Sequence, residues 1–159
     1  MPKQKMIDLL YELMKNSKRS DREIAKAVEV SQPTITRMRK SLEKTEYIRE
    51  YTIIPALGKL GFEILALNFL STSTKPKDVK EMQEWISESQ KIIFTSLGEG
   101  LGGKTVLLVS IHRDFTDFSE FTRELRGILG LATSSIESFL VSLRTDMIKH
   151  FSFKTLERI

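Results

Sequence analysis

The sequence predicts an α+β protein, because helical and strand-like patterns occupy different parts of its 159 residues. Over residues 1–47, apolar side chains recur at helical spacing. From about residue 48 onward, short runs of β-branched and aromatic residues alternate with two longer helical patterns. We therefore expect two domains, 1–47 and 62–159, joined by a linker strand and hinge over residues 48–61.

Three helices are expected within residues 3–45, and two of them carry their own start signals. Ser20 suits the N-cap of a second helix, and Glu23 three positions later completes a capping box. Ser31 suits the N-cap of a third helix, with Pro33 in its first turn. Two short helices joined by a tight turn predict a helix-turn-helix domain, here of winged-helix type.

The third helix is amphipathic in a manner that suits DNA. At about 100° per residue, Ile35, Met38 and Leu42 share one side, which must face the protein. The opposite side and its flanks carry cations and hydroxyls and no acid: Pro33, Thr36, Arg37, Lys40, Ser41 and Lys44. Such a helix fits the major groove, where Arg can pair with guanine edges and Lys can meet phosphates. The alternative is an ordinary helix pair whose charged surface is only solvated.

The expected DNA contacts combine this outward side with the two N-caps, because helix N-termini offer free amides to phosphate. They are Ser20, Ser31, Gln32, Pro33, Thr34, Thr36, Arg37, Lys40 and Lys44. Residues 1–50 hold 12 Lys or Arg against 8 Asp or Glu, which accounts for the whole net charge of +4. This local excess predicts a salt-dependent attraction to double-stranded DNA.

Composition narrows the protein class. The 40% hydrophobic content is that of a globular chain, and the absence of cysteine excludes disulfides and thiolate metal sites. No run approaches the roughly 20 apolar residues of a membrane span. Since the N-terminus also lacks an apolar signal core, the expected location is the cytoplasm.

After the linker, the patterns follow the order β-α-β-β-α-β. A linker strand over 48–54 stops at Pro55, a short turn or helix over 56–60 ends at Gly61, and 71–76 reads as a loop. The other expected elements are strands 62–70, 92–97, 105–112 and 134–143, a helix from Lys77 or Asp78, and a helix over 114–129 that Gly127 and Gly130 weaken or stop. This order predicts a ferredoxin-like sandwich, with four antiparallel strands and both helices on one face.

A series of short motifs runs in order along the chain: Ile7-Asp8-Leu9-Leu10, Arg19-Ser20, Glu23-Ile24-Ala25, Val30-Ser31, Thr34-Ile35, Arg37, Leu42-Glu43, Tyr47-Ile48-Arg49-Glu50-Tyr51 and Leu60-Gly61. In these motifs, and over nearly its entire length, the chain resembles the Lrp/AsnC, or feast/famine, regulators. The resemblance implies a DNA-binding helix-turn-helix joined to a domain that dimerises and, in many members, binds a small effector, usually an amino acid. It also implies dimers that often assemble into octamers. A two-fold dimer would recognise a palindromic DNA site, and the sheet face without helices is the expected dimer surface.

Two departures from the family pattern bear on structure and ligand. Glu29 stands where the family normally has glycine, which costs about 1 kcal/mol if the residue is left-handed. The segment between the second and third sandwich strands lacks the family's aspartate, and an effector bound there would meet Gly98, Glu99, Gly102, Gly103 and Lys104. Glu99 could replace the missing acid, or Lys104 could favour an anionic ligand. The remaining alternative is a flexible hairpin without a ligand.

Neither a cofactor, a catalytic residue nor a metal site is expected. A few proteins with this fold decarboxylate haem precursors and depend on histidines, but His112 and His150 are the only histidines here, one at a strand end and one in the tail. The sequence thus favours a sequence-specific transcription regulator. The alternatives are an architectural DNA-compacting protein and, less favoured, an enzyme of the haem-precursor type.

Overall fold

The computed structural model describes residues 3–71, 76–129 and 136–156, and its backbone contacts divide the chain into two compact units. The first unit comprises Met1–Pro55 together with Lys149–Ile159, and the second comprises Ala56–Ile148. The sequence pattern placed everything from residue 62 onward in one domain, whereas here the chain from Lys149 groups with the helices. The expected domain bounds stay a prediction.

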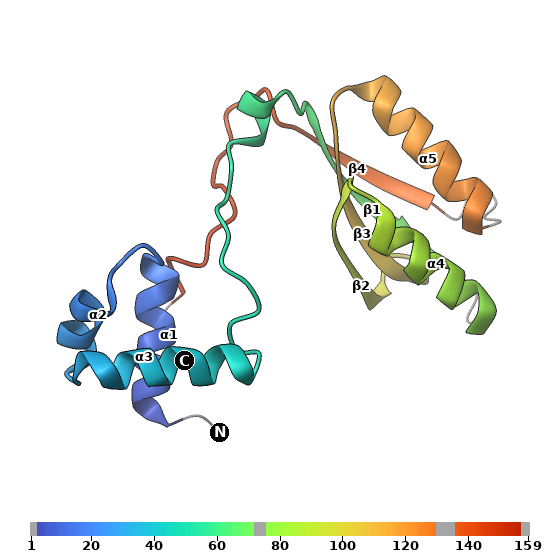
Figure 1. The fold of residues 1–159 in the computed structure, drawn as a ribbon. Coiled ribbons are helices and arrows are strands. Elements are labelled where there is room, and N and C mark those ends of the chain that lie inside the picture. Colours follow the sequence, from blue (N-terminus) through green and yellow to red (C-terminus); the bar gives the residue numbers. More distant parts are fainter. Residues whose placement is uncertain (1–2, 72–75, 130–135, 157–159) are drawn as a thin grey trace. The chain divides into compact units, whose positions relative to one another are not determined.

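The first unit is built from three helices, as the sequence predicts. They are α1 (Gln4–Lys15), α2 (Asp21–Val28) and α3 (Gln32–Lys44), drawn from blue to teal in Figure 1. Their apolar sides meet in one core that comprises Leu9, Leu13, Ile24, Ala25, Val28, Ile35 and Leu42. Because each helix contributes to this core, α2 and α3 are held as a pair against α1.

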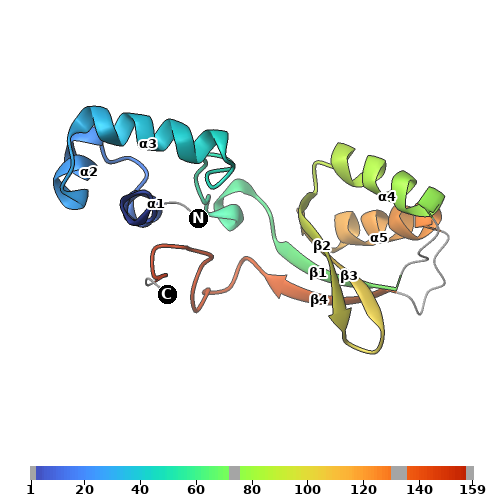
Figure 2. The same ribbon diagram turned by 90° about the horizontal axis from the view of Figure 1, so that it is seen from below.

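The second unit has the predicted β-α-β-β-α-β order. Its elements are β1 (Ile64–Leu70), α4 (Pro76–Glu88), β2 (Ile92–Gly100), β3 (Lys104–His112), α5 (Phe115–Leu129) and β4 (Ile136–Ser142). The strands pair antiparallel in the order β2-β3-β1-β4, and α4 and α5 lie on the same face of the sheet (Figures 1 and 2). This is the ferredoxin-like arrangement. The expected short helix precedes it as a 3-10 turn, Leu57–Leu60, ending at Gly61 with φ +88°.

Two predicted elements differ from the structure. The linker strand over 48–54 is wrong, because residues 49–56 carry no regular secondary structure and pair with none of the strands that the structure describes. A β-rich run forms a strand only where a partner can satisfy its backbone groups. Strand β2 is longer than expected, since its ladder with β3 continues to the pair Gly100–Lys104. The 72–75 part of the expected loop, Gly130, and the expected strand start at 134 lie outside the described residues.

The helix-covered face of the sheet is apolar, with polar groups bonded to one another in its centre. Leu70, Val106 and Leu108 pack there against Phe121 and Leu125 of α5. Beside them, the Asn68 amide donates to Ser110 Oγ at 3.0 Å and accepts from Ser138 Oγ at 2.7 Å. These hydrogen bonds join β1, β3 and β4, so they stabilise one register of the three strands.

The opposite face of the sheet is also apolar, yet no described helix covers it. One row crosses all four strands, because the register pairs Phe94 with Val109, Val109 with Leu67, and Leu67 with Phe139. Leu67 and Val109 are half-buried, whereas the flanking residues Phe94 and Phe139 are 53% and 65% exposed. We call Phe94, Val109, Leu67 and Phe139 the open-face row. A contiguous apolar row of this kind is typical of a surface that meets a partner.

Among the described residues, no helix combines the length and apolar character that a membrane crossing requires.

Candidate nucleic-acid interface

The turn between α2 and α3 is set by local backbone chemistry. Ser20 forms the predicted capping box with Glu23: its Oγ accepts from the Glu23 amide, and its own amide donates to Glu23 Oε2 at 2.7 Å. Glu29 ends α2 in the left-handed region, at φ 58° and ψ 51°. Val30 then donates its amide to Ala25 O at 3.1 Å and packs against the helical core. The departure from glycine at Glu29 therefore leaves the turn intact.

Helix α3 is held by its apolar side, as predicted. Ile35 and Leu42 are fully buried, and Met38 packs against the same core. The side chains of Arg37, Lys40 and Lys44 are exposed, and we call these three residues the cationic face. Since the buried side fixes the helix, the cationic face is presented to solvent in one orientation.

The other predicted DNA contacts differ in whether their side chains are already hydrogen-bonded within the protein. Ser31 occupies the N-cap position of α3, but its hydroxyl pairs with Thr34 Oγ1 at 2.8 Å and makes no cap. The Thr36 hydroxyl donates to Asp21 Oδ2 at 2.7 Å, so it already serves the contact between α2 and α3. Gln32 and Pro33 are exposed beside Ser31 in the first turn. Contact of these residues with DNA stays a prediction.

One residue of α3 was missed by the sequence interpretation. Arg39 lies between the apolar side and the cationic face, and its Nε and Nη2 both donate to Asp21 Oδ1, at 3.1 and 2.5 Å. The hydrogen bond from Thr36, and then that from Arg39, lower the pKa of the Asp21 carboxyl below its usual value. The sequence did contain a signal for this contact, because Arg39 lies next to the buried apolar stripe of the helix, where a charged side chain requires a partner.

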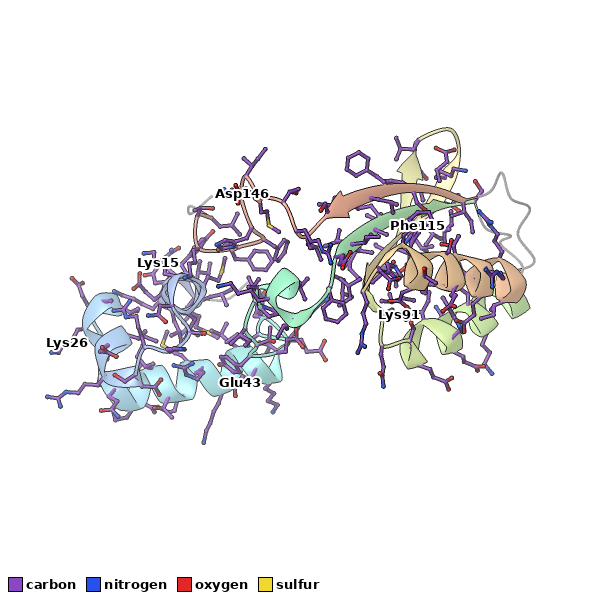
Figure 3. All side chains as sticks on the ribbon, turned by 90° about the horizontal axis from the view of Figure 1, so that it is seen from above. Lys15, Lys26, Glu43, Lys91, Phe115 and Asp146 are labelled. Atoms are coloured by element: carbon purple, nitrogen blue, oxygen red, sulfur yellow. The ribbon has the colours of Figure 1, made fainter. Side chains whose placement is uncertain are left out.

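A substitution at Glu29 should test the cost of its left-handed backbone. Glu29→Gly is expected to raise the free energy of unfolding of the helical unit by up to about 1 kcal/mol, because glycine adopts positive φ without a Cβ clash. Chemical denaturation followed by helical circular dichroism would measure the change. Lys26→Gly is the matched control: Lys26 is exposed within α2 (labelled in Figure 3), and its replacement should destabilise by about 1 kcal/mol. Equal signs for the two variants would contradict the explanation.

The predicted effector residues lie in the β2–β3 hairpin, where Lys104 already meets a carboxylate of the chain, and their contact with an effector stays a prediction. Gly98 and Glu99 lie exposed in β2, and Gly102 and Gly103 form the turn with φ of +68° and +82°. Lys104 begins β3, where its side chain is only 7% exposed and its Nζ lies 3.2 Å from Glu137 Oε1. An anionic ligand would therefore compete with a carboxylate of the chain itself.

The two histidines sit in unlike places. His112 is fully buried, with Nε2 at 2.8 Å from Ser110 Oγ and its ring against Phe118 and Phe121 at centroid distances of 5.3 and 5.0 Å. Burial lowers the pKa of His112 to about 4, although Asp117 Oδ2 lies 3.9 Å from Nδ1. His150 lies in the exposed C-terminal segment. The described residues contain no cluster of three or more side chains suited to hold a metal ion.

Comparisons with known proteins give both units a counterpart. A family described as winged helix-turn-helix DNA-binding matches residues 4–49. The HTH-type transcriptional regulator PH1692 of Pyrococcus horikoshii is 23% identical over 138 residues, which cover 87% of this chain and 90% of that protein.

Solved structures match over almost the full length. The transcriptional regulator NMB0573 of Neisseria meningitidis, solved as an L-Met complex, has a TM-score of 0.80 at 18% identity, covering 98% of this chain and 97% of that one. An AsnC family transcriptional regulator from Agrobacterium tumefaciens has a TM-score of 0.76 at 17% identity, covering 94% of each. The chain thus joins a winged helix-turn-helix DNA-binding domain to the fold of the Lrp/AsnC transcriptional regulators, the family that its sequence motifs resemble.

Proposed function

We propose that this chain is a sequence-specific DNA-binding transcriptional regulator of the Lrp/AsnC type. The observation that carries the proposal is the cationic face, which is exposed on a helix whose opposite side is fixed by buried Ile35 and Leu42. The match of residues 4–49 to a DNA-binding family supports it. As a DNA-binding protein, the chain would act in the cytoplasm.

On DNA, α3 enters the major groove with its cationic face toward the bases and backbone. Arg37 is the base reader, because its guanidinium can pair with the guanine edge. Lys40 and Lys44 meet phosphates, and the exposed N-termini of α2 and α3 at Ser20 and Ser31 offer amides to the phosphate backbone.

A homodimer would bring two copies of α3 to a palindromic site. The open-face row supplies the dimer surface, since a second copy can bury its four apolar side chains by two-fold symmetry. Half-sites would then lie about one helical turn apart, or a multiple of it. Further assembly into an octamer belongs to the same proposal.

A small effector is proposed for the β2–β3 hairpin, at Gly98, Glu99, Gly102, Gly103 and Lys104. The similarity to the NMB0573/L-Met complex supports an amino acid as the first class to test. The exposed carboxylate of Glu99 could bind the amino group of a ligand, whereas Lys104 would have to break its ion pair with Glu137 to bind a ligand carboxylate. Thermal shifts with a panel of L-amino acids, with L-Met included, would identify the class.

The first experiment is selection of bound sequences from a random DNA pool at near-physiological salt. A palindrome with half-sites about one turn apart would establish the proposal. Binding without an enriched motif would favour the architectural alternative, which differs in the specificity ratio rather than in affinity. The enzyme alternative is the weaker one, because fully buried His112 cannot offer its ring to a substrate and histidine chemistry would rest on exposed His150 alone.

Two substitutions should separate base reading from phosphate contact. Arg37→Ala is expected to cost about 1 to 3 kcal/mol on the selected site and to relax one base position. Lys44→Ala should weaken all sequences alike and lower the slope of log K against log salt by about one. Titrations on selected and random duplexes measure both effects, with Arg123→Ala, at an exposed position of α5, as the control. Equal losses on both duplexes for Arg37→Ala would remove its role as a reader.

A further inference from the structure

Helix α3, the proposed recognition helix, holds the linker by contacts with the side chain of Tyr51. Arg39 Nη1 donates to the Tyr51 hydroxyl at 3.3 Å, and its Cζ lies 5.9 Å from the centroid of the Tyr51 ring. The Tyr51 hydroxyl in turn donates to Glu43 Oε1 at 2.9 Å. Arg39 and Glu43 are one turn apart on α3, and Glu43 is labelled in Figure 3. We call Arg39, Glu43 and Tyr51 the Tyr51 clamp.

Arg39 is suited to hold the linker because its own position is fixed. Its Nε and Nη2 bond to Asp21, and its side chain is only 19% exposed. Pulling Arg39 away to contact DNA would leave the half-buried Asp21 carboxylate without its ion pair, which is costly. Arg39 thus differs from the exposed members of the cationic face and connects α2, α3 and the linker.

The clamp changes where the linker becomes free to move. Ile48 is held independently, since its amide donates to Leu42 O at 3.2 Å and its side chain packs on the helical core. Residues 49–56 have no regular secondary structure, so the Tyr51 clamp lies inside the unpaired segment. If the Tyr51 clamp were released, the last linker residue held against the helices would be Ile48 instead of Tyr51.

The added reach is large on the scale of a DNA site. Three residues of extended chain span about 10 Å, which corresponds to about three base pairs at 3.4 Å per base pair. Each protomer of a dimer would gain this freedom. A dimer without the clamp could therefore place its two recognition helices at several half-site separations.

We propose that Arg39, Glu43 and Tyr51 are positioning residues that fix the direction in which the chain leaves the recognition helix and so set the half-site spacing that the dimer accepts. This inference rests on the proposed function for its DNA consequence. The hydrogen bonds that carry it lie entirely within the first unit.

The full-length chain offers a matched pair of variants. Tyr51→Ala removes the clamp, and Tyr47→Ala is the control, because both residues are 51% exposed and the structure describes no hydrogen bond or ring contact for Tyr47. The chain has no cysteine, so Ile53→Cys allows one spin label at an exposed position just beyond the clamp. Arg39→Lys is a second test, since an ammonium cannot reach both Asp21 and the phenol as a fork does.

Two measurements then test the inference. Without DNA, the label at residue 53 should be restricted in the parent and Tyr47→Ala chains and clearly more mobile in Tyr51→Ala and Arg39→Lys. On duplexes carrying the selected half-site twice, the parent should prefer one spacing by about tenfold over a spacing three base pairs away, and Tyr51→Ala by less than about threefold. On a single half-site, the affinity of Tyr51→Ala should stay close to that of the parent.

Three results would overturn the inference. An equally restricted label in Tyr51→Ala would show that the clamp does not hold the linker. A mobile label with an unchanged spacing preference would show that the linker does not set the spacing. A parent chain that selects no half-site would overturn the proposed function and the spacing role together, while the label would still report whether the clamp exists.

Discussion

Replacing Leu67 with glutamate is expected to convert the proposed dimer into a monomer. Leu67 occupies an inner position of the open-face row, between Val109 and Phe139. In a two-fold interface, the substitution would bury two carboxylates among apolar side chains, and neither would have a partner there. Affinity for a palindrome should fall by about 100-fold or more, because the second half-site is no longer tethered. Sedimentation velocity and duplex titration would measure both changes.

The effect of Leu67→Glu must be separated from a loss of folding. Leu67 is only half-buried in the single chain, so the circular dichroism of the Leu67→Glu protein should match that of the parent. Arg123→Glu is the control, since Arg123 is exposed on α5, on the other side of the sheet, and this change should leave the dimer intact. A dimeric Leu67→Glu protein would place the interface elsewhere.

As the pH falls, protonation of His112 should destabilise the second unit before the carboxylates of that unit are protonated. The folded pKa of His112 is about 4 against an ordinary 6.5, a gap worth about 3 kcal/mol. Above pH 6.5 the ring is neutral in both the folded and the unfolded chain, so it adds no pH dependence. As the pH falls from 6.5 to 4, only the unfolded chain takes up the proton, and the free energy of unfolding decreases.

The measurement can use the fluorescence of Trp85, the only tryptophan in the sequence. The centroid of its ring lies 5.6 Å from that of Phe121, which also contacts the ring of His112. Urea unfolding followed by Trp85 fluorescence at several pH values should show the decrease in the parent chain and a flatter profile in His112→Gln. His150→Gln is the matched control, because the other histidine is exposed. The pKa of Asp117 lies below its usual value, so loss of its contribution belongs to lower pH. An unchanged slope in His112→Gln would contradict this account.

Local signals in the sequence predicted the helical unit well. The Ser20–Glu23 capping box and the Ile35–Leu42 stripe depend on residues within a few positions of each other, and both are present in the structure. The Tyr51 clamp was missed because it joins residues eight and twelve positions apart across a turn. No periodicity marks such a contact.

The second unit shows the same limit for long-range pairing. Its element order followed from alternating patterns, but the β2 ladder continues through glycines that the sequence pattern assigned to a turn. Lys104 was considered as a residue that could favour an anionic ligand, whereas its burial and its contact with Glu137 depend on strands far apart in the chain. The linker strand was expected from its β-branched and aromatic residues, although a strand also needs a neighbour.

Strand β2 contains a bulge that affects how copies of this chain can associate edge to edge. The ladder with β3 shifts between Ile92 and Phe94, in a strand that lies at the border of the sheet. Bulges and charges along a border strand hinder edge-to-edge pairing, the route to open-ended fibres. On β4, the other border, Glu137 is exposed. Edge-to-edge pairing is thereby hindered at both borders, whereas the two-fold contact proposed for the open-face row would close on itself and would not propagate.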